Sequence, residues 1–329
     1  MAGCKDSVLR WALFFSCCTV VFLSGCASKP SPVDSYVDAV VLNGLDKNDQ
    51  AIAKLNIALK KDPKFSLAYS FKGDIYQQQK KYAKSAASYE KAVAINAWSF
   101  HDSFNLAKVY QAMQKYDSAI KSYSRAIELE PGNFQANLNN AQCYHEIKDD
   151  DKALEYAKIA EQVASTDSLE LRKLLGDIYA SRKDNQLAIA SYKKVLEADS
   201  SNPQTMLSLA KVYLKTELNE PAKQLLVAAS ELQPQNSDTY KYLGYCLLKL
   251  GKLDEAVENY SKAVDINNLD WDAHRGLGVA FILQAKNTGG LMDLDLKAKA
   301  VKQWQKSLDI KPDQPNSDKL KNLIEKYSD

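Results

Sequence analysis

The sequence has little of what metal sites and catalytic centres are built from. It contains only three histidines, His101, His145 and His274, which lie too far apart along the chain to share the spacing of a metal site. It has no Cys-x-x-Cys, His-Glu-x-x-His, Gly-x-Ser-x-Gly or phosphate-binding loop. We therefore expect no metal, no cofactor and no enzymatic activity. The Asp149–Asp151 run is predicted to be a solvated turn between helices.

Charge of either sign is not in excess, and residues that break helices are scarce. The 43 Lys and Arg residues nearly balance the 41 Asp and Glu residues, for a net charge of +2. Nucleic-acid binding usually needs a basic surplus or stripe, so we expect no nucleic-acid partner. Only 12 Gly and 9 Pro occur in 329 residues, which favours helices over strands.

The N-terminal segment is too short to span a membrane as a helix but has the three parts of an export signal. Lys5 and Arg10 precede the apolar run Trp11–Leu23, and small residues follow it. The run is shorter than the roughly 20 residues that a spanning helix needs. A positive flank, a short apolar core and small residues at the exit predict a cleaved signal peptide over 1–25.

The end of this segment, Leu23-Ser24-Gly25-Cys26, resembles the lipobox of bacterial lipoproteins. The resemblance implies cleavage before Cys26 and lipidation of its thiol, with 26–31 as the lipidated cysteine and a short linker. Because Ala27 rather than Asp follows Cys26, the same resemblance implies the outer membrane, facing the periplasm. A plain secretory signal, the inner membrane and the cell surface remain alternatives. Elsewhere, Cys143 and Cys246 are predicted to be small buried residues that form no disulfide.

The remaining chain repeats itself with a step of about 34 residues. One copy shows the frame as Ala119, Tyr123 and Ala126, followed by Pro131, and a small residue precedes a bulky one upstream, as Ala107 and Tyr110. The frame recurs with Leu55, Tyr192, Leu226 and Tyr260 at the bulky place. About eight copies follow in register over 32–65, 66–99, 100–133, 134–167, 169–202, 203–236, 237–270 and 271–314.

This pattern resembles the tetratricopeptide repeat (TPR). The resemblance implies an all-α TPR solenoid, a right-handed superhelix of about eight helical hairpins over 32–314 with a capping helix over 315–329. The small places let paired helices approach, and the bulky places fill the gaps between hairpins. The last copy carries extra residues around Asn287–Leu296, where Gly289 and Gly290 should break a helix. A protruding contact loop and a neutral insertion are both open for that segment.

The resemblance also implies a concave groove lined by the first helix of each hairpin, at its second, fifth, ninth and twelfth places. These places give Phe104, Lys108, Gln111, Leu138, Gln142, His145, Lys173, Asp177, Leu207, Lys211, Leu214, Lys241, Tyr245 and Leu248. Such a lining of apolar, amide and basic groups suits an extended peptide or a partner helix. Ordinary solvated or stacking residues are the alternative.

The predicted function is a membrane-anchored scaffold or adaptor that faces the periplasm and binds envelope proteins through this groove. The resemblance is to lipoproteins that assemble secretion, pilus or cell-wall machines. An enzyme or glycan-handling factor of the envelope with an unrecognised site is the alternative, and self-association of the stack is a third possibility.

Overall fold

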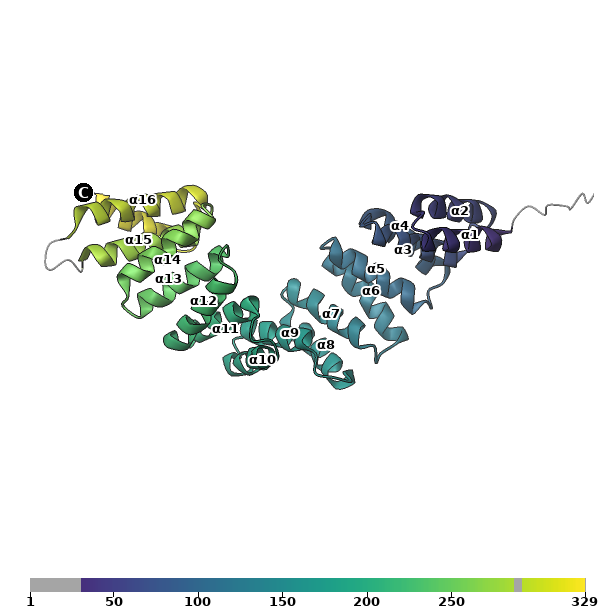
Figure 1. Cartoon of the computed structure of the whole chain (residues 1–329), viewed down its shortest axis with the longest axis horizontal. Coiled ribbons are helices and arrows are strands. Elements are labelled where there is room, and N and C mark those ends of the chain that lie inside the picture. The colour runs from purple at the N-terminus through teal and green to yellow at the C-terminus, as the bar shows by residue number, and fades with distance from the viewer. Residues whose placement is uncertain (1–30, 287–291, 329) are drawn as a thin grey trace, which may run out of the picture. The chain divides into compact units, whose positions relative to one another are not determined.

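The computed structural model describes residues 31–286 and 292–328. Within them the chain forms 17 helices and no strand, which confirms the all-α prediction and the TPR-type hairpins (Figure 1). The chain divides into two compact units, called here unit 1 (Met1–Glu130) and unit 2 (Pro131–Asp329). Each unit is described by itself.

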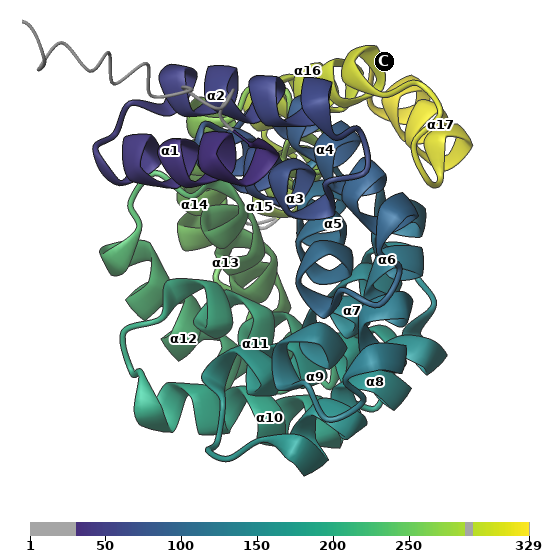
Figure 2. The same ribbon diagram turned by 90° about the vertical axis from the view of Figure 1, so that its right-hand side faces the viewer.

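Unit 1 is a stack of three helical hairpins. Its helices are α1 (Pro32–Gly44), α2 (Asn48–Lys61), α3 (Ser66–Gln78), α4 (Tyr82–Ile95), α5 (Phe100–Ala112) and α6 (Tyr116–Leu129). Each first helix packs on the second helix of its own hairpin, and α2 and α4 also pack on the next hairpin (Figure 2). The first hairpin ends the stack with an exposed row of valines on α1: Val33, Val37, Val40 and Val41 are 43–58% exposed.

Unit 2 contains five hairpins and a final single helix. Its helices are α7 (Phe134–Glu146), α8 (Asp150–Val163), α9 (Leu169–Ser181), α10 (Asn185–Ala198), α11 (Pro203–Lys215), α12 (Asn219–Leu232), α13 (Ser237–Lys249), α14 (Leu253–Ile266), α15 (Trp271–Lys286), α16 (Leu294–Ile310) and α17 (Ser317–Ser328). The last helix, α17, packs on α16 where the sequence predicted a closing helix (Figure 2).

Close contact between a small residue and a bulky ring stabilises several of the hairpins. A Cβ on Gly73 would lie 2.7 Å from the Tyr89 ring, and one on Gly278 would lie 2.4 Å from Trp304. Both rings are at most 1% exposed. Burial of such a ring stabilises the fold by about 1.5–3 kcal/mol, which requires the small residue opposite. The predicted roles of the small and bulky places are therefore confirmed here.

Side-chain caps explain where most first helices begin. The cap residues are Ser31, Ser99, Asn133, Ser168, Asn202 and Asn236, and each accepts a hydrogen bond from the backbone N–H three residues on. Such a bond satisfies one of the free N–H groups at a helix start and contributes about 1 kcal/mol.

The turn inside each of the first seven hairpins contains one residue with positive φ. These residues are Asp46, Lys80, Gln114, Lys148, Lys183, Glu217 and Gly251. In each turn the next residue donates its N–H to a carbonyl five residues back, as Lys81 does to Tyr76 at 2.8 Å. This is the Schellman closure of a helix, for which glycine is the usual residue. Only Gly251 follows that usage, so these backbone bonds hold six residues of four other types in the left-handed region.

The extra residues of the last hairpin are partly helical. Asp293 caps α16 by accepting hydrogen bonds from the N–H groups of Asp295 and Leu296. Residues 294–296 of the predicted insertion therefore belong to α16, because an aspartate in this position starts a helix. Gly289 and Gly290 lie outside the described residues, so the contact-loop prediction stays a prediction.

Candidate binding site

The three predicted groove residues of unit 1 lie on α5 and contact their own hairpin. Phe104 stacks on Phe100 with ring centroids 5.4 Å apart, and the Lys108 ammonium lies 5.6 Å from the Phe104 centroid. Gln111 accepts a 2.7 Å hydrogen bond from the Tyr123 hydroxyl. Lys108 is exposed and the other two are half-buried, so α5 presents one mixed apolar and basic row.

Three predicted groove leucines of unit 2 are buried by the chain itself. Leu138, Leu207 and Leu214 are 0, 3 and 9% exposed. Leu207 and Leu214 belong to one large apolar cluster around α11. In this conformation they stabilise the stack and offer a partner almost no surface.

The other predicted residues of α7, α9 and α11 form contacts within unit 2. Gln142 donates to Glu170 at 2.8 Å, and His145 lies 2.7 Å from Asp150. Lys173 pairs with Asp177 at 2.8 Å, one helical turn away. The Lys211 ammonium lies 4.9 Å from the centre of the Tyr242 ring. These residues are partly exposed and remain candidates for binding.

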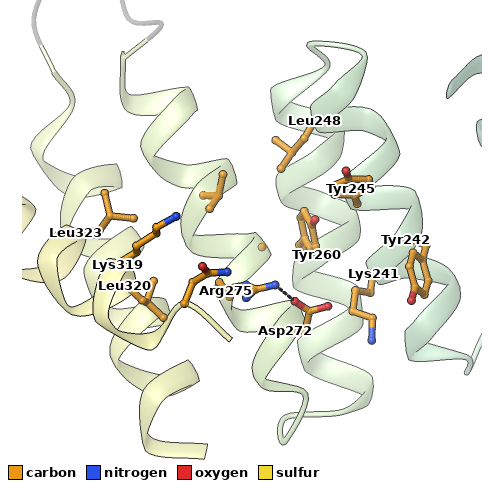
Figure 3. Close-up of a pocket in the computed structure, with 13 residues that line it drawn as sticks. Lys241, Tyr242, Tyr245, Leu248, Tyr260, Asp272, Arg275, Lys319, Leu320 and Leu323 are labelled. Carbon is orange, nitrogen blue, oxygen red and sulfur yellow. Dashed lines mark hydrogen bonds and ion pairs between the residues drawn. The ribbon is translucent and has the colours of Figure 1, made fainter. Parts of the chain in front are cut away.

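The predicted residues of α13 converge on a cavity of about 540 Å³. Lys241, Tyr245 and Leu248 all line it, together with side chains from three further helices. The rest of the lining is Tyr242 of α13, Tyr260 of α14, Asp272, Arg275, Gly276 and Val279 of α15, and Asn316, Lys319, Leu320 and Leu323 at α17. Figure 3 shows the tyrosines of α13 and α14 on one side of α15 and the α17 side chains on the other. We call this cavity the α17 pocket.

Lys241 is held in place at one edge of the α17 pocket. Its ammonium lies 2.7 Å from Asp238 and 2.8 Å from Asp270, and its side chain is 14% exposed. Burial alone would lower the pKa of Lys241, but the hydrogen bonds to these two carboxylates raise it above its usual value. Burial likewise acts to raise the pKa of Asp270, and the bond to Lys241 lowers it overall. Lys241 is therefore a neutralised structural cation.

Arg275 connects α15 to the segment that enters α17. Its guanidinium donates to Asp272 at 2.6 Å and to the Pro315 carbonyl at 3.3 Å, and it lies 5.0 Å from the Trp271 ring centre. These contacts leave further guanidinium N–H groups without a bond among the described residues. Lys319 of α17 also faces the pocket, and no ion pair involves it within the described chain.

Tyr260 forms the floor of the α17 pocket and differs from its counterparts in other hairpins. Its side chain is 3% exposed and lies against Gly244 and Gly276, where a Cβ would come within 2.7 and 2.3 Å of the ring. The Tyr192 hydroxyl donates to Asp177 at 2.7 Å. In the hairpin of Tyr260 the place of Asp177 is taken by Tyr245, and no hydrogen bond of the Tyr260 hydroxyl occurs in the described part of the chain. Burial raises the pKa of Tyr260, so its hydroxyl keeps its proton.

Sequence reasoning missed part of this lining. Asp272, Arg275 and Val279 occupy the second, fifth and ninth places of the last repeat, so the same spacing applied to 271–314 would have found them. The α17 side chains lie outside the repeat, and no spacing rule points to them. Their presence depends on how α17 packs on the last hairpin.

One Ser, Asp and His grouping occurs in unit 2, but its order does not suit nucleophilic catalysis. Asp150 accepts from both His145 and Ser181, so the carboxylate stands between the other two. A nucleophilic serine needs to donate to the histidine instead. Asp149 lies in the turn before α8 and caps that helix, as the predicted turn position requires. Asp150 and Asp151 form the first turn of α8, so the predicted turn is wrong for these two residues. Acidic residues favour that position because the helix dipole is positive there.

The two cysteines of unit 2 are unreactive thiols. Cys143 and Cys246 are free and buried, which confirms the prediction for them. Burial raises the pKa of Cys143 to about 12 and that of Cys246 to about 11. Both therefore stay protonated at neutral pH, and only the thiolate is a good nucleophile or metal ligand.

The described residues contain neither a metal-binding cluster nor a membrane-spanning helix. No group of three His, Cys, Asp or Glu side chains in residues 31–286 and 292–328 is placed to hold a metal ion. None of the helices in these ranges is both long enough and apolar enough to cross a bilayer. Cys26, the predicted lipidation site, lies outside them and stays a prediction.

Comparison with protein families supports the tetratricopeptide repeat. A tetratricopeptide repeat family matches residues 42–98 and 104–168, and a second TPR family matches 244–284. A family described as anaphase-promoting complex, cyclosome, subunit 3 matches residues 181–263. TPR proteins bind protein or peptide partners and are generally adaptors rather than enzymes.

Curated relatives match only part of the chain. BBSome complex member BBS4 of Xenopus tropicalis is 28% identical over 123 residues, which is 37% of this chain and 24% of that protein. The small glutamine-rich tetratricopeptide repeat-containing protein 2 of Mycosarcoma maydis is 28% identical over 120 residues, 36% of this chain and 33% of that protein. The chain thus spans a third or less of the length of these relatives.

Solved structures share the fold at low sequence identity. Cut9, in the APC/C hetero-tetramer Cut9-Hcn1, aligns over 98% of this chain and 60% of its own, with a TM-score of 0.61 and 15% identity. A tetratricopeptide repeat protein from Parabacteroides merdae aligns over 76% of this chain and 98% of its own, with a TM-score of 0.56 and 14% identity. PilF of Pseudomonas aeruginosa aligns over 63% of this chain and 94% of its own, with a TM-score of 0.54 and 19% identity. At these identities the likeness concerns the fold alone.

Proposed function

We propose that this protein is a lipid-anchored scaffold that faces the periplasm and binds envelope proteins through the first helices of its hairpins. The anchor is Cys26, and the outer membrane is the proposed location. The binding part rests on one observation: predicted groove residues of α13 converge with α15 and α17 on an open cavity of about 540 Å³. Pockets of 300–1,000 Å³ that combine apolar walls with a few polar groups are typical binding sites.

The anchoring part is supported by sequence. Leu23-Ser24-Gly25-Cys26 ends a short apolar run, and α1 begins at Pro32, a few residues after Cys26. Lipid chains on Cys26 would hold the first hairpin close to the membrane, because two or more acyl chains anchor stably. Assembly of a secretion, pilus or cell-wall machine is the proposed setting. BBS4, by its name, is a member of a complex, which fits the use of such repeats in assemblies.

The anchor is tested by labelling cells with radioactive palmitate. We expect label in the wild-type protein and none in Cys26→Ser, with the wild type in the outer-membrane fraction. A Cys143→Ser variant is the matched control and should label fully, because that thiol is buried in unit 2. Equal labelling of Cys26→Ser and the wild type would contradict the anchor.

The binding role is tested by crosslinking in the cell envelope followed by mass spectrometry. We expect a reproducible set of envelope proteins that is lost in Lys108→Glu combined with Tyr245→Ala, which alter two exposed groove side chains. Leu187→Ala, on an exposed position of the second helix α10, is the control and should retain the set. Lys241 is unsuitable for this test because its loss leaves Asp238 and Asp270 without their cation. Recovery of the same set of proteins with the Lys108→Glu, Tyr245→Ala variant as with Leu187→Ala would contradict binding through the groove.

A further inference from the structure

The α17 pocket presents hydrogen-bond donors in excess of the acceptors around it. The Tyr260 hydroxyl has no bond among the described residues although the ring is 3% exposed. Arg275 retains spare N–H groups, and Lys319 has no ion pair in the described chain. The one lining carboxylate, Asp272, already accepts from Arg275. The Tyr260 hydroxyl is free to donate into the pocket, so the floor favours a ligand that supplies an acceptor.

Positively charged side chains outnumber negatively charged ones in the lining of the pocket. Lys241 is paired with Asp238 and Asp270, and Arg275 is paired with Asp272. Lys319 is the remaining charge of the lining, and it is positive. An anionic acceptor therefore fits this pocket better than a neutral or cationic one.

The walls of the pocket are apolar and add a second requirement. Leu248, Val279 and Leu323 come from three different helices, and Leu320 and the tyrosines of α13 complete the wall. The volume of the pocket is about 540 Å³. It exceeds what one carboxylate needs and leaves room for a large apolar side chain.

Gly276 is what gives a ligand access to Tyr260. Other first helices carry a side chain at this sixth place, such as Phe71, Leu174 and Tyr242. At Gly276 even a Cβ would lie 2.8 Å from the Tyr260 hydroxyl oxygen. The hydroxyl is therefore uncovered in this hairpin because the residue above it has no side chain.

From this combination we infer that the α17 pocket binds an extended peptide segment in which a large apolar side chain and a carboxylate side chain are two residues apart. Alternate side chains of an extended chain lie on one face, about 6.6 Å apart, so both can enter the same pocket. The apolar side chain packs on Leu248, Val279 and Leu323. The carboxylate accepts from the Tyr260 hydroxyl and from Arg275 and Lys319. This inference rests on the proposed binding function and names the chemistry of one segment of the partner.

The test uses the full-length protein in detergent and a fluorescein-labelled peptide, capped at both ends, with the central order phenylalanine, serine, glutamate. We expect saturable binding by fluorescence anisotropy. Glutamine in place of the glutamate, or alanine in place of the phenylalanine, should weaken binding by about 10-fold. Placing the phenylalanine and glutamate side by side should weaken it as well. No binding at 1 mM protein, or equal affinity for the glutamine peptide, would overturn the inference.

Matched variants assign any binding to this pocket. Tyr260→Phe removes only the hydroxyl and should weaken binding by about 5-fold, and Arg275→Gln with Lys319→Gln by about 10-fold. Tyr192→Phe, whose hydroxyl already bonds to Asp177, and Lys321→Gln, elsewhere on α17, should bind as the wild type does. Circular dichroism confirms that each variant is folded. Equal affinity of the wild type and the pocket variants, or displacement of the peptide by a cell-wall sugar fragment, would overturn the inference.

The two levels of the proposal fail separately. Envelope crosslinks that survive in Tyr260→Phe and in Arg275→Gln with Lys319→Gln, together with failure of the peptide test, refute the pocket and leave the scaffold role. Specific peptide binding without any reproducible envelope crosslink refutes the proposed scaffold role and leaves the pocket.

Discussion

The first hairpin of unit 1 and the last hairpin of unit 2 finish their helical stacks in different ways. In unit 1, α1 leaves a row of valines that are 43–58% exposed. In unit 2, α17 packs on the last hairpin, where Leu320 and Tyr327 are 4 and 8% exposed and the Tyr327 and Trp304 ring centroids lie 6.0 Å apart. A repeat cannot bury its apolar face without a neighbour, so an added helix replaces the next repeat.

This difference shows that a closing helix can serve both stability and recognition. The same helix that covers Trp304 also brings Lys319 and Leu323 to the wall of the α17 pocket. The valine row of α1 has no such helix among the described residues. Three substitutions with matched partners sharpen this contrast, from the largest expected effect to the smallest.

The largest effect is expected from Trp304→Ala at the closed end. Trp304 is 1% exposed, fills the space over Gly278 and donates its indole N–H to the Arg275 carbonyl at 3.3 Å. Its loss should destabilise unit 2 by about 3–5 kcal/mol. Hydrogen exchange with mass spectrometry should show faster exchange in α15–α17 and unchanged exchange in α1–α4. Leu55→Ala, at the same place in the first hairpin, should speed hydrogen exchange in α1–α4 and leave α15–α17 unchanged. Faster exchange along the whole chain in either variant would contradict the difference between the two ends.

A smaller loss is expected from Leu320→Ala in α17. Leu320 is 4% exposed, so its truncation should cost about 2–3 kcal/mol, measured by urea unfolding. Val40→Ala in α1 is the matched control at 43% exposure and should change stability by less than about 0.5 kcal/mol. A comparable loss in the Val40 variant would show that the valine row is covered in solution.

The smallest effect is expected from Lys241→Met, and it depends on pH. The pKa of Asp270 is lowered, so its stabilising pair with Lys241 is complete above the ordinary carboxylate value of about 3.9 and is lost as the pH falls below it. The raised pKa of Lys241 keeps the pair intact up to the ordinary lysine value of about 10.4. Because Asp238 is more than half exposed and Asp270 also accepts hydrogen bonds from the backbone N–H groups of Asp272 and Ala273, we expect a loss of only about 1 kcal/mol at pH 7.

Urea unfolding at pH 7 and pH 3 measures this effect. The gap between Lys241→Met and the wild type should narrow at pH 3, because the stabilisation from the Asp270–Lys241 pair declines as the pH falls below the ordinary carboxylate value. Hydrogen exchange in α1–α4 should not change, because Lys241 lies in unit 2. The fifth places of the repeats in unit 1 carry no lysine, being Tyr36, Ser70 and Phe104. A gap that widens in acid would contradict the assignment of the ion pairs.

The repeat architecture could be predicted because its determinants are local and recur. In several hairpins a small residue meets a ring contributed by the next helix, as Gly73 meets Tyr89, and Leu55 and Leu226 take the place of the ring in two others. The candidate groove was harder to predict. Leu138 and Lys241 share the fifth place, yet one is 0% exposed and the other holds two carboxylates at the edge of a pocket. Exposure at a given place depends on the side chains of adjacent hairpins, which spacing does not specify.

Only part of the α17 pocket could be predicted from the repeat. Spacing alone would have added Asp272, Arg275 and Val279, but the missing acceptor of Tyr260 becomes visible only when its hydroxyl is compared with that of Tyr192. Leu320 and Leu323 reach the pocket because a helix outside the periodic pattern packs back on it. Nonlocal packing of this kind has no signature in a single sequence.

The left-handed turns bear on how such a chain can lengthen or shorten over time. Seven turns close with the same pair of backbone hydrogen bonds while carrying aspartate, lysine, glutamine, glutamate or glycine. Because main-chain groups make the closure, genetic exchange between misaligned copies that joins them at this point would give a turn of the same geometry. Whole hairpins could thus be gained or lost there without a compensating change of side chain.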